Sequence, residues 1–191
     1  MSDDLPTFDE ASIFPPHHLD YATLDARVRG LSPAKDQAVV ERVVLRLSNN
    51  RRRMPGRARL DVEAGVVGDR WLDGRTPKRH SQVTLMRYDV ARVLTDGNEV
   101  AILGDNLFAS IDTSAENLPP GSLLRVGTAL CEVTYKPHEG CSKFAARVGE
   151  DAWKLTLSDD WRAVQLRGVH LSVIESGDVS EGDRISVLRR S

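Results

Sequence analysis

Cys141 has the residue type and the setting in this chain that are best suited to chemistry. It follows Gly140 in a polar turn and precedes a segment with helical character, and several cationic residues lie close to it in the sequence. A thiol reacts as its thiolate, and nearby cations and a helix N-terminus both favour that form. The commoner fate of a lone cysteine is a buried, inert side chain. The polar surroundings of Cys141 favour the reactive interpretation.

The second cysteine, Cys131, lies in an apolar strand pattern. Cys131, Val133 and Tyr135 alternate onto one face of this strand, whereas polar side chains occupy the other face. This pattern predicts that Cys131 is a core residue and that Cys141 is the accessible thiol. Two cysteines in such different settings do not form a disulfide framework.

His138 precedes the candidate thiol by three residues. It could deprotonate Cys141, or stabilise the thiolate as an imidazolium. A turn histidine that is hydrogen-bonded to the backbone is an equally good interpretation. The other histidines have no spacing to cysteine or aspartate that resembles a zinc site.

The bulk properties restrict the class of protein. A chain of 191 residues is long enough for one domain with a hydrophobic core. Its net charge of -2 argues against a nucleic-acid partner bound through general phosphate neutralisation. The acidic N-terminus does not resemble a secretory signal, and no apolar run has the length of a membrane span. We therefore expect a cytoplasmic protein with reduced thiols and no membrane partner.

Many short strands and few helices are predicted. Apolar alternation and Gly/Pro turns indicate strands over 39–47, 57–62, 82–86, 106–112, 123–126, 129–135, 168–174 and 184–188. Helical spacing indicates short helices over 20–28, 88–94 and 151–157, and another after Cys141. This pattern predicts a mainly β fold, a Greek-key-like and mostly antiparallel barrel with a few short peripheral helices. Residues 1–37 should form an arm and a helix that pack on a barrel domain over 38–191.

Two further expectations concern burial. The core should include Val43, Leu45, Val83, Leu85, Val133, Val169 and Leu171, and the strand over 39–47 should turn Val39 to the same face as Val43. A basic cluster contains the three consecutive arginines over 51–53 together with Arg57 and Arg59. We expect an exposed hairpin loop there, with contact to phosphate or nucleic acid as the alternative.

Short segments spread along the chain resemble those of one known family, in the family's order. They are Gly65-Val66-Val67-Gly68-Asp69-Arg70-Trp71, Gln82-Val83-Thr84-Leu85-Met86, Gly104-Asp105-Asn106-Leu107, Glu116-Asn117-Leu118-Pro119-Pro120-Gly121 with Leu124-Arg125-Val126-Gly127, the Cys141 segment, and Leu166-Arg167-Gly168-Val169 with Glu181-Gly182-Asp183. The chain thereby resembles a MOSC domain, named for the C-terminal part of molybdenum cofactor sulfurase. The resemblance covers roughly residues 38–190.

This resemblance implies a β-barrel and a cysteine that carries sulfur or ligates molybdenum. In cofactor sulfurases the module works beside a cysteine desulfurase domain that uses pyridoxal phosphate. In amidoxime-reducing relatives the cysteine ligates the molybdenum of a pterin cofactor, which reduces N-hydroxylated compounds. This chain has no room for a desulfurase domain and no ferredoxin-like or flavin extension. A persulfide would therefore come from a separate cysteine desulfurase, and electrons from a separate donor protein.

The chemistry that the resemblance implies selects candidate site residues from the sequence. Cys141 would be the catalytic residue and the metal ligand, and His138, by its position three residues before the thiol, would be a second catalytic residue. Molybdenum binds thiolate well, and a pterin phosphate needs cationic partners. The candidate cofactor-binding residues are Asn106, Lys143, Arg147 and Arg167. A solvated surface charge is the alternative for each cation, and a role in a turn is the alternative for Asn106. We expect one concavity lined by Cys141, Asn106, Arg167 and at least one of Lys143, Arg147 and His138.

Two other functions remain open at this stage. One is a module that holds a small-molecule or oxyanion ligand without turnover. The other is a scaffold within a larger molybdoenzyme assembly. An activated thiol at Cys141 argues against a pure scaffold, whereas nothing in the residues separates an enzyme or sulfur carrier from a binding module.

Overall fold

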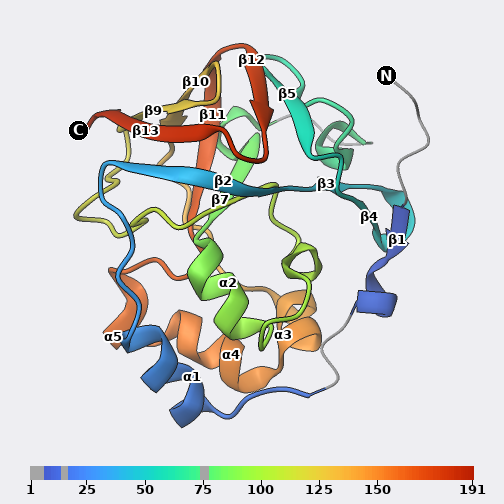
Figure 1. The fold of residues 1–191 in the computed structure, drawn as a ribbon, viewed down its shortest axis with the longest axis vertical. Coiled ribbons are helices and arrows are strands. Elements are labelled where there is room, and N and C mark those ends of the chain that lie inside the picture. Colours follow the sequence, from blue (N-terminus) through green and yellow to red (C-terminus); the bar gives the residue numbers. More distant parts are fainter. Residues whose placement is uncertain (1–6, 14–16, 74–77) are drawn as a thin grey trace.

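A closed barrel of seven strands forms the centre of the molecule (Figure 1). The computed structural model describes residues 7–13, 17–73 and 78–191. In barrel order the strands are β10 (Ala129–Val133), β11 (Val169–Glu175), β7 (Val83–Met86), β8 (Leu107–Ala109), β2 (Gln37–Val43), β13 (Arg184–Arg189) and β9 (Leu123–Val126). Every neighbouring pair is antiparallel except β7 and β8, which run parallel. The prediction of a mainly β, mostly antiparallel barrel is confirmed.

Two small sheets extend from the barrel. One contains β1 (Thr7–Asp9), β4 (Arg51–Arg53) and β3 (Leu45–Arg46), and the other contains β12 (Gly177–Ser180), β5 (Arg57–Asp61) and β6 (Gly65–Val66). Short 3-10 turns occupy Glu10–Ile13, Ser48–Asn50, Arg70–Leu72, Arg79–Ser81 and Val100–Leu103.

The arginine cluster over 51–53 is not the exposed loop that its charge predicted. It forms β4, the central strand of its small sheet, and the side chain of Arg52 is fully buried. The Arg52 Nε donates a hydrogen bond to the carbonyl oxygen of Ala101, at 3.3 Å. The prediction was wrong because the 3-10 turn over 100–103, distant in sequence, supplies a backbone acceptor that satisfies the buried guanidinium group.

Five helices gather at one end of the barrel, in the lower half of Figure 1. They are α1 (Tyr21–Arg29), α2 (Tyr88–Leu94), α3 (Ser142–Val148), α4 (Glu150–Leu157) and α5 (Asp159–Arg162). The apolar faces of these helices form a second hydrophobic core, separate from that of the barrel. This second core includes Leu24, Val90 and Phe144. Of the N-terminal arm, β1 pairs with β4, and α1 packs against α4 and α2. Within the described residues, none of the helices is both long and apolar enough for a membrane span.

A β-bulge changes which side chains of β2 face inward. Val39 is 50% exposed and Val40 is fully buried, the reverse of the predicted alternation. The pairing of β2 with β8 shifts register between Val40 and Arg42, and an extra residue in one strand exchanges its two faces. Beyond the bulge, Val43 packs in the barrel core and Val44 in the helical core, so both faces are covered.

The remaining core predictions are confirmed, since all seven side chains are buried: Val43, Leu45, Val83, Leu85, Val133, Val169 and Leu171. Gly168 fixes the start of β11, directly after Arg167. Its φ is +81°, and a Cβ there would lie 2.0 Å from the carbonyl oxygen of Leu85. Only glycine lets the backbone pass this close to β7. Gly168 therefore fixes the position of the backbone at Arg167, just before β11 begins.

Candidate functional site

Cys141 is exposed and lies at the first turn of α3. Its carbonyl oxygen accepts hydrogen bonds from the backbone N–H groups of Phe144 and Ala145, at 2.9 and 3.1 Å. Partial burial disfavours the charged thiolate, but the backbone N–H groups of Phe144 and Lys143 and the charge of Arg147 outweigh it. The pKa of the Cys141 thiol is therefore below its ordinary value.

Cys131 has the opposite environment. It lies on β10 with no exposed surface, and burial raises the pKa of its thiol to about 12. The predicted division between an accessible and a core cysteine is confirmed.

Thiol labelling of the native protein should therefore modify Cys141 and spare Cys131. The rate should rise with pH through a midpoint below that of an ordinary cysteine, because the thiolate is the reactive form. Mass spectrometry of peptides after brief exposure to iodoacetamide measures both rates. Preferential modification of Cys131 would contradict the assignment.

A cationic cleft of about 760 Å³ opens beside the start of α3. Its lining residues are Arg46, Ser48, Arg70, Trp71, Asp73, Lys78, Ser81, Lys136 and Lys143. Five of these nine carry positive charge and one carries negative charge, so the cleft favours an anionic ligand. Cys141 is not among the lining residues, whereas Lys143, two residues after it in the sequence, is.

Asn106 supports this cleft from the interior. Its side chain is fully buried; Nδ2 donates to Asp69 Oδ2 at 2.9 Å, and Oδ1 accepts from the Thr84 hydroxyl at 3.1 Å. Asp69 in turn forms an ion pair with Arg46, with Nη2 and Oδ1 2.8 Å apart. Asn106 therefore holds Asp69, which orients Arg46 at the cleft. Asn106 itself is not among the residues that line the cleft.

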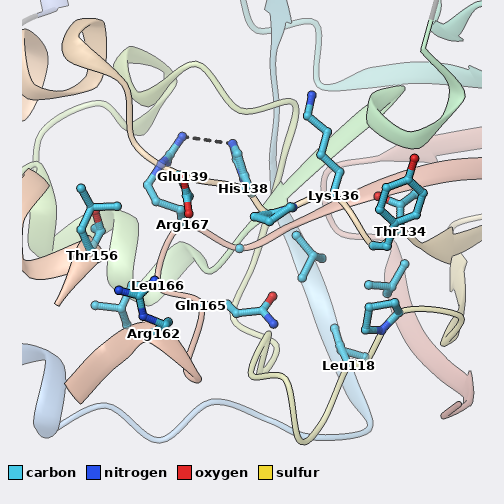
Figure 2. Close-up of a pocket in the computed structure, with 17 residues that line it drawn as sticks. Leu118, Thr134, Lys136, His138, Glu139, Thr156, Arg162, Gln165, Leu166 and Arg167 are labelled. Atoms are coloured by element: carbon cyan, nitrogen blue, oxygen red, sulfur yellow. Dashed lines mark hydrogen bonds between the residues drawn. The ribbon is translucent and has the colours of Figure 1, made fainter. Parts of the chain in front are cut away.

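A second, smaller cavity of about 200 Å³ contains His138 and Arg167 in its wall (Figure 2). Arg167 is buried, and its Nη1 lies 2.8 Å from Asp105 Oδ2 and 2.9 Å from Met86 Sδ. Its Nη2 lies 3.3 Å from His138 Nε2, the contact drawn as a dashed line in Figure 2. The ring of His138 also lies 4.5 Å from that of His170.

The side chain of His138 is only 10% exposed, and its predicted action on Cys141 stays a prediction. Burial, with the charges of Arg167 and His170, holds the pKa of His138 well below its ordinary value. The ring is therefore neutral at physiological pH, which conflicts with an imidazolium that stabilises a thiolate. No hydrogen bond joins it to Cys141 among the described residues.

Arg147 is buried, with Nη1 3.5 Å from the carbonyl oxygen of Leu103. The predicted residues are thus distributed over two cavities and the interior, and not in one concavity. Lys143 lines the cationic cleft, and His138 and Arg167 line the smaller cavity, while Asn106 and Arg147 are buried and line neither. Lys136 lines both cavities.

Cys141 and Arg167 nevertheless lie on the same side of the barrel. The guanidinium carbon of Arg167 is 4.3 Å from the centre of the Phe144 ring, a cation–π contact. Phe144 belongs to the first turn of α3, whose backbone is hydrogen-bonded to Cys141. One buried ion pair therefore packs against the turn that carries the thiol.

Comparison with known proteins agrees with this fold. The family model described as MOSC domain matches residues 80–186. The chain belongs to the MOSC domain family. Among solved structures it is similar to YiiM from Escherichia coli, with 17% identity and a TM-score of 0.56 over 81% of this chain and 71% of that one. The YuaD protein from Bacillus subtilis matches with 14% identity and a TM-score of 0.57, over 78% and 94% of the two chains. No curated protein matches the sequence.

The two buried histidines make the stability of this MOSC barrel depend on pH. Burial and the charge of Lys136 lower the pKa of His170 to about 4, below the ordinary 6.5. The folded state then binds fewer protons than the unfolded state, so stability is complete above pH 6.5 and is lost as pH falls towards 4. His170 alone contributes up to about 3 kcal/mol of this loss.

We expect His170→Phe to show a shallower decrease of unfolding free energy between neutral pH and pH 4 than the wild type. Urea unfolding at a series of pH values measures this. Comparing the variant with the wild type separates His170 from Asp105, whose burial raises the pKa of its carboxyl and so acts in the opposite direction. Identical pH slopes in the two proteins would contradict the assignment.

Several residues that line or support the two cavities were absent from the set of predicted site residues. They are Arg46, Asp69, Arg70, Lys78, Asp105, Lys136 and His170. Asp69, Arg70 and Asp105 belong to segments that carry the family resemblance, and this signal could have selected them. Lys78 and His170 have no such signal, because only the barrel brings them to these cavities.

Proposed function

We propose that the cationic cleft holds an anionic molybdenum–pterin cofactor and that Cys141 supplies a thiolate ligand to the metal. The observation that carries this proposal is an exposed thiol with a lowered pKa two residues from Lys143, which lines a cleft with five cations. A soft thiolate suits molybdenum, and cationic side chains suit a pterin phosphate.

The residues present fit such a group in charge and in donor type. Arg46, Arg70 and Lys78 offer positive charge in the wall of the cleft that also contains Lys143. Both Nε and Nη2 of Arg46 donate to the buried Asp69 carboxylate, at 3.0 and 2.8 Å, so one cationic group is fixed before a ligand arrives. Arg147, though buried, favours the thiolate through its charge.

When bound, the cofactor would supply two-electron redox chemistry at molybdenum, which in this family's amidoxime-reducing members acts on N-hydroxylated compounds. This chain's residues would bind the anion, keep Cys141 ionised and leave it accessible. Electrons would come from a separate donor protein. A cytoplasmic location would keep both thiols reduced.

Sulfur carriage is the second function that the same thiol supports. An accessible thiolate can accept a sulfur atom from the persulfide of a separate cysteine desulfurase. The lowered pKa of Cys141 favours it, because thiolate is the attacking species. In this case the cations of the cleft would bind the molecule that accepts the sulfur atom from Cys141.

Protein purified from a host that makes the cofactor tests the proposal. Elemental analysis should find molybdenum, and fluorescence of the oxidised pterin should find the organic part in the same ratio. If Cys141 carries sulfur, mass spectrometry of peptides after digestion of the same sample without reducing agent should show a mass increase of one sulfur atom on the Cys141 peptide. A protein that carries neither would be a binding module without this chemistry, and the proposal would be wrong.

A further inference from the structure

The smaller cavity has one apolar wall and one polar end. Its apolar lining consists of Leu118, Pro120, Val133, Pro137, Leu157, Leu166 and Val169. Figure 2 shows the polar side chains of His138, Arg167, Gln165 and Lys136 arranged around the same space. A volume of about 200 Å³ is close to that of an apolar cavity of about 150 Å³ that accommodates benzene. It therefore suits a molecule with a single ring or a branched aliphatic body.

Two buried nitrogen atoms at the polar end have no hydrogen-bond partner within the part of the chain that the structure describes. They are His138 Nδ1 and Arg167 Nε. His138 Nε2 lies 3.3 Å from Arg167 Nη2 and 3.2 Å from Asp105 Oδ1, a buried oxygen that also lacks a hydrogen bond within the described residues. A guanidinium group only donates, so the tautomer that accepts from Arg167 carries its ring proton on Nδ1, whereas the tautomer that donates to Asp105 carries it on Nε2. Arg167 Nε is a donor in both cases, and His138 Nδ1 is a donor in the first tautomer, which is the one that the proposal below uses. Buried donors without partners cost free energy, and an acceptor placed in the cavity would remove this cost.

The other polar groups around the cavity also favour an acceptor with negative charge. Lys136 adds one cation, and the Gln165 amide makes no side-chain hydrogen bond among the described residues. Arg162 is exposed and paired with Asp159, so its charge contributes little. Gln165 has a φ of +52°, an unusual conformation for a residue other than glycine. The opposing Glu139 is exposed, so water screens its charge.

We propose that this cavity binds a small organic acid, with its carboxylate at His138 and Arg167 and its apolar body against Leu118, Val133 and Leu166. The inference does not rest on the proposed cofactor, because the cavity shares only Lys136 with the cationic cleft. Two donors that face one carboxylate, together with an apolar wall, select for acids over amides or amines of the same shape.

Three probes with one ring and different head groups test the proposal: benzoate, benzamide and benzylamine. Titration at neutral pH, followed by amide proton–nitrogen correlation spectra, should show benzoate binding with a Kd on the order of 1 mM. The shifted resonances should include Val133, Gly168 and Val169. Benzamide should bind at least about tenfold more weakly, since it forms no charge-assisted hydrogen bond, and benzylamine should not bind.

His138→Phe keeps a ring but removes the Nδ1 donor, and it should weaken benzoate binding about tenfold. The matched control is His80→Phe, at a histidine that does not line this cavity. If His138→Phe does not fold, Gln165→Leu provides a second test at the rim, with an expected loss of about threefold or more.

Benzoate binding should persist in metal-free Cys141→Ser protein, which separates this inference from the cofactor proposal. Equal binding of benzoate and benzamide would overturn the inference. So would benzoate shifts confined to Arg70, Lys78 and Lys143 of the cleft, or the absence of any shift, which would indicate a cavity filled by water alone.

Discussion

Cys141→Ser should lose most of the molybdenum that the wild-type protein retains, a decrease of more than about tenfold per protein molecule. Serine keeps the size of the side chain but replaces a thiolate by a hydroxyl that does not ionise at neutral pH, so the soft ligand is lost. The same variant should show no mass increase from a bound sulfur atom. Elemental analysis and mass spectrometry of protein from one cofactor-producing host measure both quantities.

The matched control is Cys131→Ala, which removes the other thiol from the barrel core. It should retain molybdenum, although a buried cavity will lower its stability by about 1 kcal/mol or more. Cys141→Ser should stay within about 0.5 kcal/mol of the wild type, because its side chain is exposed. Full molybdenum retention by the Cys141 variant would contradict the role of the thiolate.

The second large effect is expected at the buried ion pair. Arg167→Met should destabilise the protein by about 3 to 5 kcal/mol, because it leaves the fully buried Asp105 carboxylate without its cation. The effect should reach the thiol as well, since Arg167 packs on Phe144 in the first turn of α3. Denaturant unfolding measures the stability, and the pH dependence of alkylation measures the change at Cys141.

A double variant separates charge from packing. Asp105→Asn combined with Arg167→Met removes both charges and should recover part of the lost stability, whereas independent sites would give additive losses. Arg162→Met is the control, because this arginine is exposed and its partner Asp159 is too; it should change stability by about 0.5 kcal/mol or less. A small effect of Arg167→Met would show that Asp105 is protonated or solvated in the folded protein.

The sequence by itself determined the local structure and the identity of the reactive thiol. The hairpin of β9 and β10 follows from alternating apolar residues on either side of Gly127, which is a pattern of period two. The same alternation buries Cys131, and the polar turn before α3 exposes Cys141. The helix Tyr88–Leu94 also has the predicted bounds. These features depend on neighbours within a few residues, so periodicity and turn chemistry are sufficient to predict them.

Only the tertiary structure decided which polar residues meet. The bulge in β2 exchanged the buried and exposed positions of Val39 and Val40, and the Arg52 side chain is buried where it bonds to the carbonyl oxygen of Ala101. Neither feature can be predicted from the sequence of a single strand. Asn106 became an interior support because Asp69, distant in sequence, lies beside it. The cleft and the smaller cavity likewise combine side chains from separate segments, and residue spacing does not encode such distances. Barrel closure brings these segments together, and burial then selects which of their charges are paired and which remain available to a ligand.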